Sequence, residues 1–256
     1  MIGKTNSQTG GAVKGEKLNI SLGSNQADKS DLIGAIISVS HPGGTTNYTW
    51  EGYELTVNVP PYVEYTVSYS NIVGYKTPAS FSSTAVPDNS RTLTPIYEST
   101  VVTVMMEDNQ PSLDDVASAT ATVYAEGIEP TVLHAGESVK VPSGSTCSLI
   151  WGNLEDYKTP ASQSFTASGS EVTKSGVYMT EVVRVMLSAD NGESLDGASV
   201  TINGKTHFWA GEEIVQKVAF GVEYSITSGF FGGFVVPSVQ SFTANSESRQ
   251  ISLVYP

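Results

Sequence analysis

The chain has 256 residues, a formal net charge of -13 and one cysteine, Cys147. The negative charge opposes binding to a phosphate backbone, so we expect no nucleic-acid partner. A single cysteine excludes an intramolecular disulfide, and the absence of any run of 18 apolar residues predicts no membrane span.

Residues 1–16 differ from the rest of the chain. They are rich in Gly, Thr, Asn, Ser and Gln, and they include no apolar region of the kind that a secretory signal needs. If Met1 is the native start, no export by a standard signal is expected. We interpret the segment as an extended N-terminal arm that docks on a partner, against the alternative of a mobile tail. The candidate anchoring residues are Ile2, Lys4, Thr5, Asn6 and Lys14.

Residues 17–99 predict a sandwich of short strands. The expected strands are residues 18–22, 33–39, 48–50, 54–59, 64–70, 80–84 and 91–97, with turn residues between them. The alternation is clearest in the fifth strand, where Tyr65, Val67 and Tyr69 share one face. No segment has the periodicity of an amphipathic helix, so very little helix is expected.

The same pattern occurs three times. Residues 75–80 recur unchanged as residues 157–162, and a weaker copy covers residues 234–238. Each copy ends on a tyrosine, at Tyr97, Tyr178 and Tyr255. The sequence therefore predicts an all-β protein: three tandem seven-stranded Ig-like β-sandwich domains at residues 17–99, 100–180 and 181–256, arranged as a rod behind the arm at residues 1–16.

Residues that could support catalysis are scarce. His41, His134 and His207 fall in different repeats, and no common catalytic or nucleotide-binding motif is present. Cys147 takes the place of a core tyrosine and is interpreted as a small buried hydrophobic residue. We therefore expect no enzyme activity, no catalytic residues, no cofactor and no metal.

Acidic loops follow the opening strand of each repeat. Calcium binding is a weaker interpretation of them than ordinary turn chemistry, because Asn, Asp and Gly are the residues that tight turns use. The residues concerned are Asn25, Asp28, Asp31, Asp108, Asn109, Asp114, Asp115, Asp190, Asn191 and Asp196.

Aromatic residues supply the candidate ligand-binding surface. Tyr48, Trp50, Tyr53 and Trp209 are better explained as core residues, because aromatic side chains dominate sandwich packing. The exception is the Gly-rich stretch of the third repeat, and its candidate binding residues are Phe230, Phe231 and Phe234.

Residues 197–204, Gly211, residues 222–226, Pro237 and residues 242–244 together carry a family resemblance. The pattern resembles PEGA-type and carboxypeptidase-regulatory-like sandwiches, which have Ig-like or transthyretin-like seven-stranded folds, and it extends over residues 17–256 as three copies. The first two copies lack the Asn203-Gly204 turn, and the strand order stays open. Tandem units of this kind are similar to virion proteins of phages that infect gut bacteria and to surface adhesion proteins of those bacteria. The resemblance implies no catalytic residues.

The leading functional hypothesis is a non-enzymatic phage virion component, such as a head fibre, decoration or tail-associated protein. Its partners would be other virion proteins, through the arm, and a host-surface glycan or protein. The alternative is a bacterial cell-surface adhesin or glycan-binding module, and a third hypothesis is an accessory module of an enzyme. Whether the chain forms a homo-oligomer stays open.

Overall fold

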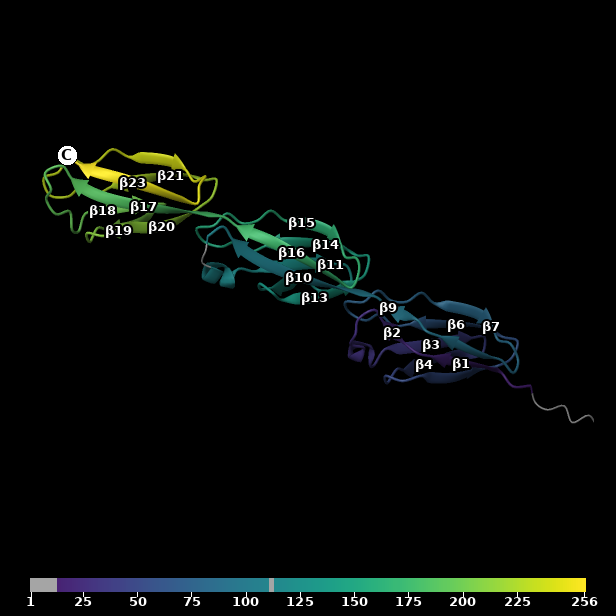
Figure 1. Ribbon diagram of the computed structural model, residues 1–256. Helices are drawn as coiled ribbons and strands as arrows, with labels where there is room; N and C mark the ends of the chain where they lie inside the picture. The colour runs from purple at the N-terminus through teal and green to yellow at the C-terminus, as the bar shows by residue number, and fades with distance from the viewer. Residues whose placement is uncertain (1–12, 111–112) are drawn as a thin grey trace, which may run out of the picture.

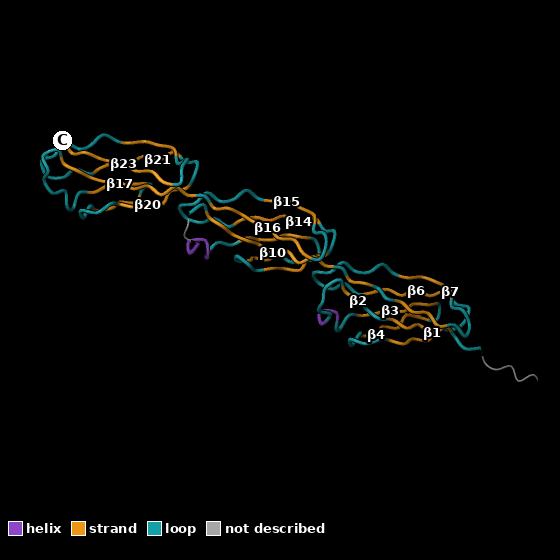
Figure 2. The backbone as a smooth tube through the Cα atoms, in the orientation of Figure 1, coloured by secondary structure: helices purple, strands orange, loops and turns teal. Residues whose placement is uncertain are grey.

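The computed structural model describes residues 13–110 and 113–256, and within these ranges the chain is almost entirely β-structure. The elements lie in three successive groups along one line (Figure 1), and loops gather at the two ends of each group (Figure 2). We call these groups the first module (β1 to β9), the second module (β10 to β16) and the third module (β17 to β23). The prediction of an all-β chain of Ig-like sandwiches is confirmed.

The strand bounds show how closely the modules repeat. The first module contains β1 (Glu16–Ile20), β2 (Gly23–Ser24), β3 (Ile36–His41), β4 (Gly44–Thr49), β5 (Leu55–Val59), β6 (Glu64–Tyr69), β7 (Phe81–Thr84), β8 (Ser90–Leu93) and β9 (Ile96–Tyr97). The second contains β10 (Ser99–Asp108), β11 (Ala121–Ala125), β12 (Thr131–Leu133), β13 (Ser138–Pro142), β14 (Thr146–Trp151), β15 (Gln163–Thr166) and β16 (Glu171–Tyr178). The third contains β17 (Thr180–Ala189), β18 (Ser199–Ile202), β19 (Lys205–Phe208), β20 (Ile214–Ala219), β21 (Glu223–Ser228), β22 (Gln240–Thr243) and β23 (Ser248–Tyr255).

Helical structure is limited to two short 3-10 segments in the described residues. They are η1 (Ser30–Leu32) and η2 (Leu113–Ser118), and each follows the opening strand of its module. No helix in the described ranges is long and apolar enough to cross a membrane.

Each module consists of two sheets with a fixed strand order. In the second module, β10 lies between β13, which is antiparallel to it, and β16, which is parallel to it; the other sheet has the order β12-β11-β14-β15. The third module repeats this as β20-β17-β23 and β19-β18-β21-β22. The first module has the same arrangement, but its first and last strands are each interrupted. The first is divided into β1 and β2 and the last into β8 and β9, and β1 pairs with β8 while β2 pairs with β9.

The first, fourth and seventh strands thus form one sheet, and the remaining four form the other. A constant-type immunoglobulin domain divides its strands as ABED and CFG. The modules have the two layers and seven strands of an Ig-like sandwich but a different division of strands. This settles the strand order that the sequence left open.

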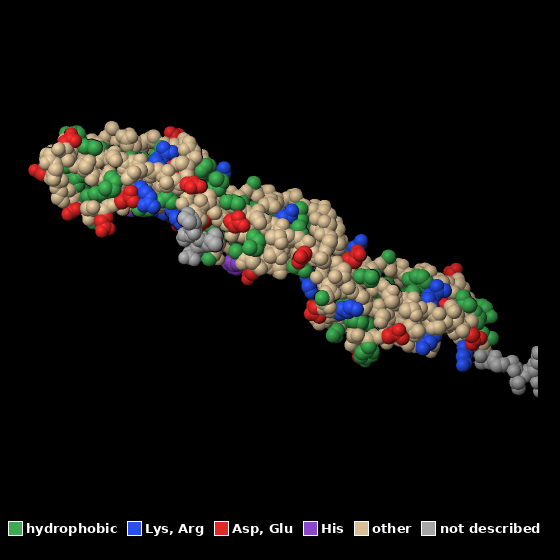
Figure 3. Space-filling view, in the orientation of Figure 1, with side chains coloured by type: hydrophobic (Ala, Val, Ile, Leu, Met, Phe, Trp, Pro, Cys, Tyr) green, Lys and Arg blue, Asp and Glu red, His purple; other side chains and the backbone are tan. Residues whose placement is uncertain are grey.

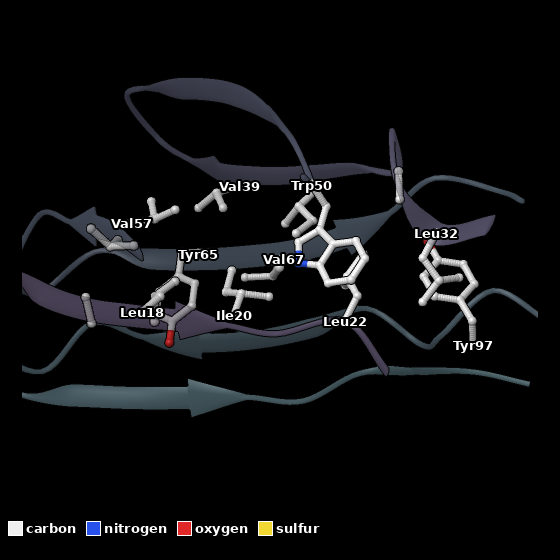
Figure 4. Packing of buried hydrophobic residues seen from close by; sticks show 14 of the residues in the cluster. Leu18, Ile20, Leu22, Leu32, Val39, Trp50, Val57, Tyr65, Val67 and Tyr97 are labelled. Carbon is white, nitrogen blue, oxygen red and sulfur yellow. The ribbon is translucent and has the colours of Figure 1, made fainter. Parts of the chain in front are cut away.

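Apolar side chains from both sheets meet between the layers. Figure 4 shows this for the first module, where Ile20 of β1 lies close to Val67 of β6 and to Trp50, and Leu18 of β1 lies beside Tyr65 of β6. Each module has a separate core cluster of this kind. In β14 the alternate residues Cys147, Leu149 and Trp151 are all buried, and Cys147 is buried as predicted.

The closing tyrosine of each module ties the last strand to the opposite sheet. Tyr97, Tyr178 and Tyr255 are fully buried. Their hydroxyls donate to backbone carbonyls just after the fifth main strand, at 2.6 Å, 2.7 Å and 3.0 Å respectively. A buried hydroxyl needs such a partner, so the bond fixes the position of each ring.

A buried carboxylate joins the first strand to the last strand in two of the modules. Glu16 and Glu181 are fully buried. The Nε atom of Arg91 donates to Glu16 at 3.1 Å, and that of Arg249 donates to Glu181 at 2.6 Å. The two pairs occupy equivalent positions, so the first and third modules share this cross-strand link.

At the same two positions the second module has uncharged residues, one with a hydroxyl side chain and one with an apolar side chain. Val102 pairs with Val172 in the register where Val183 pairs with Arg249. Val172 therefore corresponds to the arginine, and Thr100 corresponds to the glutamate. The chain thus contains an uncharged version of the same link.

Burial and hydrogen bonding act in opposite directions on the carboxylates. For Glu181, burial raises the pKa. Hydrogen bonds from the Ser246 backbone, Arg249 and the Asn245 backbone together lower the pKa by more than burial raises it, so the pKa lies below its ordinary value. The pKa of Glu16 is lowered in the same way. Such a carboxylate stabilises the fold above the unfolded pKa, near 4.5, and this contribution is lost as the pH falls through the folded pKa.

We expect acid to destabilise the chain through these two pairs. In a variant carrying E16T, R91V, E181T and R249V, which places the uncharged pair in all modules, the loss of stability between about pH 5 and pH 3 should be smaller than in the unaltered chain. Thermal unfolding followed by circular dichroism measures this loss. The single change Arg249→Leu serves as a control, because an unpaired buried carboxylate should cost about 3 kcal/mol at neutral pH. An equally steep acid dependence in the fourfold variant would contradict the assignment.

Candidate functional site

The junctions between modules are the most elaborate features of the structure. Only Glu98 separates β9 from β10, and only Met179 separates β16 from β17. The Glu98 carbonyl accepts backbone N–H bonds from Lys76 of the first module at 2.8 Å and from Ser143 of the second at 3.2 Å. The Met179 carbonyl accepts two equivalent bonds at 2.8 and 3.2 Å. Each connecting residue is therefore held by both modules, and no slack linker is present.

An asparagine clamps the residue that opens each following module. The side chain of Asn25 donates to the Ser99 carbonyl at 2.7 Å and accepts the Ser99 N–H at 2.8 Å. Asn109 makes the same two bonds with Thr180, both at 2.7 Å. Ser99 and Thr180 are fully buried, so the amide satisfies polar backbone groups that water cannot reach.

The glutamine after each clamping asparagine reaches deeper into the following module. Gln26 donates to the carbonyl of the clamped residue at 2.9 Å and to that of Ser170 at 3.2 Å. Gln110 donates to the carbonyl of Thr180 at 3.3 Å and to the carbonyl of Glu247 at 3.0 Å. One Asn-Gln pair therefore binds both the first strand of the next module and the loop before its last strand.

A lysine from each following module lies over a tyrosine of the preceding one. Lys140 donates to the Tyr75 hydroxyl at 3.2 Å and to Asp31, and Lys217 donates to the Tyr157 hydroxyl at 2.9 Å. The lysine nitrogens lie 5.6 and 5.5 Å from the ring centres, within cation–π range. The bond to Asp31 raises the pKa of Lys140. The verbatim repeat at residues 75–80 and 157–162 thus begins at a junction residue.

The second junction has an additional polar cluster. Asp156, with a positive φ of 64°, accepts hydrogen bonds from Lys205 at 2.7 Å, Gln216 at 3.1 Å and Asn203 at 3.2 Å. Gly74 holds the equivalent place at the first junction and also has a positive φ, 80°. The Asn203 turn, which carried part of the family resemblance, therefore contacts the preceding module.

The acidic loops belong to these junctions. Asp28 and Asp108 each accept a backbone N–H two residues further along, as in an ordinary Asx turn, and Asp31 binds the junction lysine. The side chains of Asp114 and Asp115 lie outside the described residues. Among the described residues, no group of three or more His, Cys, Asp or Glu side chains is placed to hold a metal ion.

The far end of the third module lacks the junction side chains. Gly192 aligns with the glutamines Gln26 and Gln110 of the other modules. Phe234 and Val235 align with the Tyr-Lys pairs at residues 75–76 and 157–158. This end is therefore not equipped for the contacts that hold the two junctions.

An exposed apolar segment replaces those contacts. Phe230 is 77% exposed, Val235 65% and Val239 59%. Phe231 and Phe234 instead pack against the third core and stack on each other, with ring centres 6.4 Å apart. Of the three aromatic residues predicted to form the binding surface, Phe230 is thus the most exposed, and Phe231 and Phe234 are partly buried.

Acidic side chains surround this end. Asp190, Glu193 and Asp196 are exposed in the loop after β17. Figure 3 shows acidic and hydrophobic side chains, without Lys or Arg, on the outermost part of this end. The basic side chains of residues 181–256 contact partners elsewhere, in the pairs Arg184–Glu213, Lys205–Asp156, Lys217–Tyr157 and Arg249–Glu181.

The opposite end of the chain holds the predicted anchor. Of its candidate residues, Ile2, Lys4, Thr5 and Asn6 lie outside the described residues. Lys14 is exposed, and its carbonyl accepts the Asp88 N–H at 3.1 Å.

Comparison with known proteins does not assign the chain to a family. No family model matches the chain, and no curated protein matches it. Among solved structures, it is similar to the TIE protein of Bacillus anthracis, with 15% identity, a TM-score of 0.32, and coverage of 94% of this chain and 50% of that one.

Two proteins of Lactobacillus rhamnosus GG are also similar. The pilus adhesin SpaC in its open conformation has 11% identity, a TM-score of 0.40, and coverage of 95% of this chain and 43% of that one. The shaft pilin SpaA has 12% identity, a TM-score of 0.35, and coverage of 66% of this chain and 98% of that one. The chain spans half or less of TIE and SpaC. Identities and scores this low carry no inference about function.

Proposed function

We propose that the chain is a non-enzymatic spacer of a structural or adhesion protein, which holds the far end of its third module at a fixed distance from an attachment point. The observation that carries this proposal is the repeated junction. The clamp by Asn25 and Gln26 recurs at Asn109 and Gln110, so the chain encodes the same stiff connection twice.

The proposal treats the modules as tandem domains, at residues 17–99, 100–180 and 181–256. Separate core clusters and single-residue connections support this division. A sandwich of about 80 residues has enough core to fold as a unit.

The attachment point would be the arm at residues 1–16. Two settings suit such a spacer: a virion, in a head fibre, decoration or tail-associated protein, and a bacterial cell surface.

The far end would be the contact surface. It combines the exposed Phe230, Val235 and Val236 with a loop that carries three acidic side chains. An apolar centre with an acidic rim suits a protein surface that has apolar and basic residues. A glycan is the alternative partner, through stacking on Phe230.

A graft from the preceding modules tests this surface. The variant Phe230→Asn, Val235→Lys, Val236→Thr carries the residues found at the equivalent positions of both other modules. We expect binding of the labelled chain to bacterial cells to weaken by tenfold or more, equivalent to about 1.4 kcal/mol, because the apolar contact is lost. Flow cytometry and a glycan array together measure the binding and separate the two partner classes.

The control removes an exposed apolar side chain from the first module. Ile33→Ser, at a residue that is 60% exposed, should leave binding unchanged. Equal binding by the graft and the unaltered chain would show that the far end is not the contact surface.

A further inference from the structure

The first and last strands of a module lie side by side and run in the same direction. In the second module the pairing runs from Val101–Glu171 to Asp108–Tyr178, over the whole length of β16. In the third it runs in the same way from Val182–Ser248 through to the end of β23. The chain enters each module at the start of the first strand and leaves it at the far end of the last strand.

This register determines how a pulling force acts. The strands lie along the long axis of the chain (Figures 1 and 2), so tension draws the first strand toward one end and the last strand toward the other. Hydrogen bonds between parallel strands are evenly spaced along the pair, and sliding the strands past each other strains all of them together. Pulling both strands from the same end would instead break the bonds one after another.

We propose that the chain bears tensile load, with each module resisting it by shear between its first and last strands. The inference goes beyond the proposed spacer role, because it rests on strand register and not on what the far end contacts.

Three further features support load transfer through this strand pair. Glu181 on β17 binds Arg249 on β23, which adds a buried link across the loaded pair, and Glu16 and Arg91 do so in the first module. The closing tyrosine fixes the last strand to the second sheet. The single-residue junctions pass force from β16 to β17 without an intervening coil.

Single-molecule force spectroscopy on the full chain tests the proposal. In the first geometry, handles are fused to the two ends, so that every module is loaded in shear. In the second, the C-terminal handle is moved to a cysteine introduced by Ser248→Cys, at an exposed position. Force then enters and leaves the third module at the same end of the β17–β23 pair. Cys147 does not compete for the handle, because it is fully buried.

The third module should open at a severalfold lower force in the second geometry, because its strand bonds then break in sequence. The first and second modules are loaded identically in both geometries and act as internal references. The paired change Glu181→Thr with Arg249→Val, which copies the second module, should lower the opening force of the third module under end-to-end pulling. Equal opening forces for the third module in the two geometries would overturn the proposal, whatever the far end binds.

Discussion

Replacing Gly176 with leucine is expected to destabilise the second module by about 3 kcal/mol or more. Gly176 lies in β16 and faces the core, where a Cβ atom would come within 2.7 to 2.8 Å of three atoms of the Trp151 ring. Trp151 is only 4% exposed and is surrounded by core residues, so the ring has no free space to enter.

The third module shows why the glycine is there. Leu253 is equivalent to Gly176, since each lies two residues before the closing tyrosine of its module. When β21 is aligned with β14, Ser228 is equivalent to Trp151. One module has a large residue on the fifth strand and a small one on the last strand, and the other has the reverse. The same volume is filled from opposite sheets.

The reversal supplies a rescue experiment. Trp151→Ser alone should cost about 3–5 kcal/mol by leaving a cavity, whereas Trp151→Ser combined with Gly176→Leu should recover much of the loss of either change. Hydrogen exchange of the β10 and β16 amides reports the stability of this module within the full chain. Val177→Leu, on the exposed face of the same strand, should have little effect. A double variant no more stable than Gly176→Leu would contradict the exchange of volume.

Most of the strands could be predicted because alternation and turn residues define them locally. The expected strands at residues 54–59 and 64–70 agree with β5 and β6 to within one residue at each end. The expected strand at residues 91–97 is divided into β8 and β9, with Pro95 in the gap. Proline has no N–H to give to the ladder, which explains the interruption.

The exchange of volume between the two sheets could not be predicted from the alignment of repeats. His134 stands in the second repeat where Trp50 and Trp209 stand in the other two. His134 is exposed, and the second module buries Trp151 from another strand instead. Which strand fills a given volume depends on the facing sheet, and a one-dimensional alignment does not contain that information.

The side-chain clamps at the junctions were the main feature that the sequence did not reveal. The pair Asn25-Gln26 recurs as Asn109-Gln110, and this was a usable signal. It was interpreted as turn chemistry because Asn is common in turns. The bonds from these side chains span more than 70 residues, to groups whose burial only the folded chain defines.

Removing the clamp at the second junction is expected to free the third module to swing. Asn109→Ala would remove the side-chain partner of the buried Thr180 N–H and one of the two side-chain partners of its C=O, at a cost of about 1–3 kcal/mol in the closed arrangement. Part of that cost is avoided if the junction opens and water reaches these groups. The sandwich cores do not include Asn109, so both modules should stay folded while the angle between them varies.

Distances between spin labels on the second and third modules measure the effect directly. We expect a broader distance distribution in the Asn109→Ala variant, with an unchanged circular dichroism spectrum. Asn191→Ala is the matched control, because Asn191 holds the same place in the third module but makes none of the junction bonds; its side chain accepts the Glu193 N–H at 3.0 Å. If the Asn109 variant keeps the narrow distribution, the connection by Met179 and the cluster at Asp156 is sufficient for stiffness, and the asparagine clamp is not what holds the modules in line.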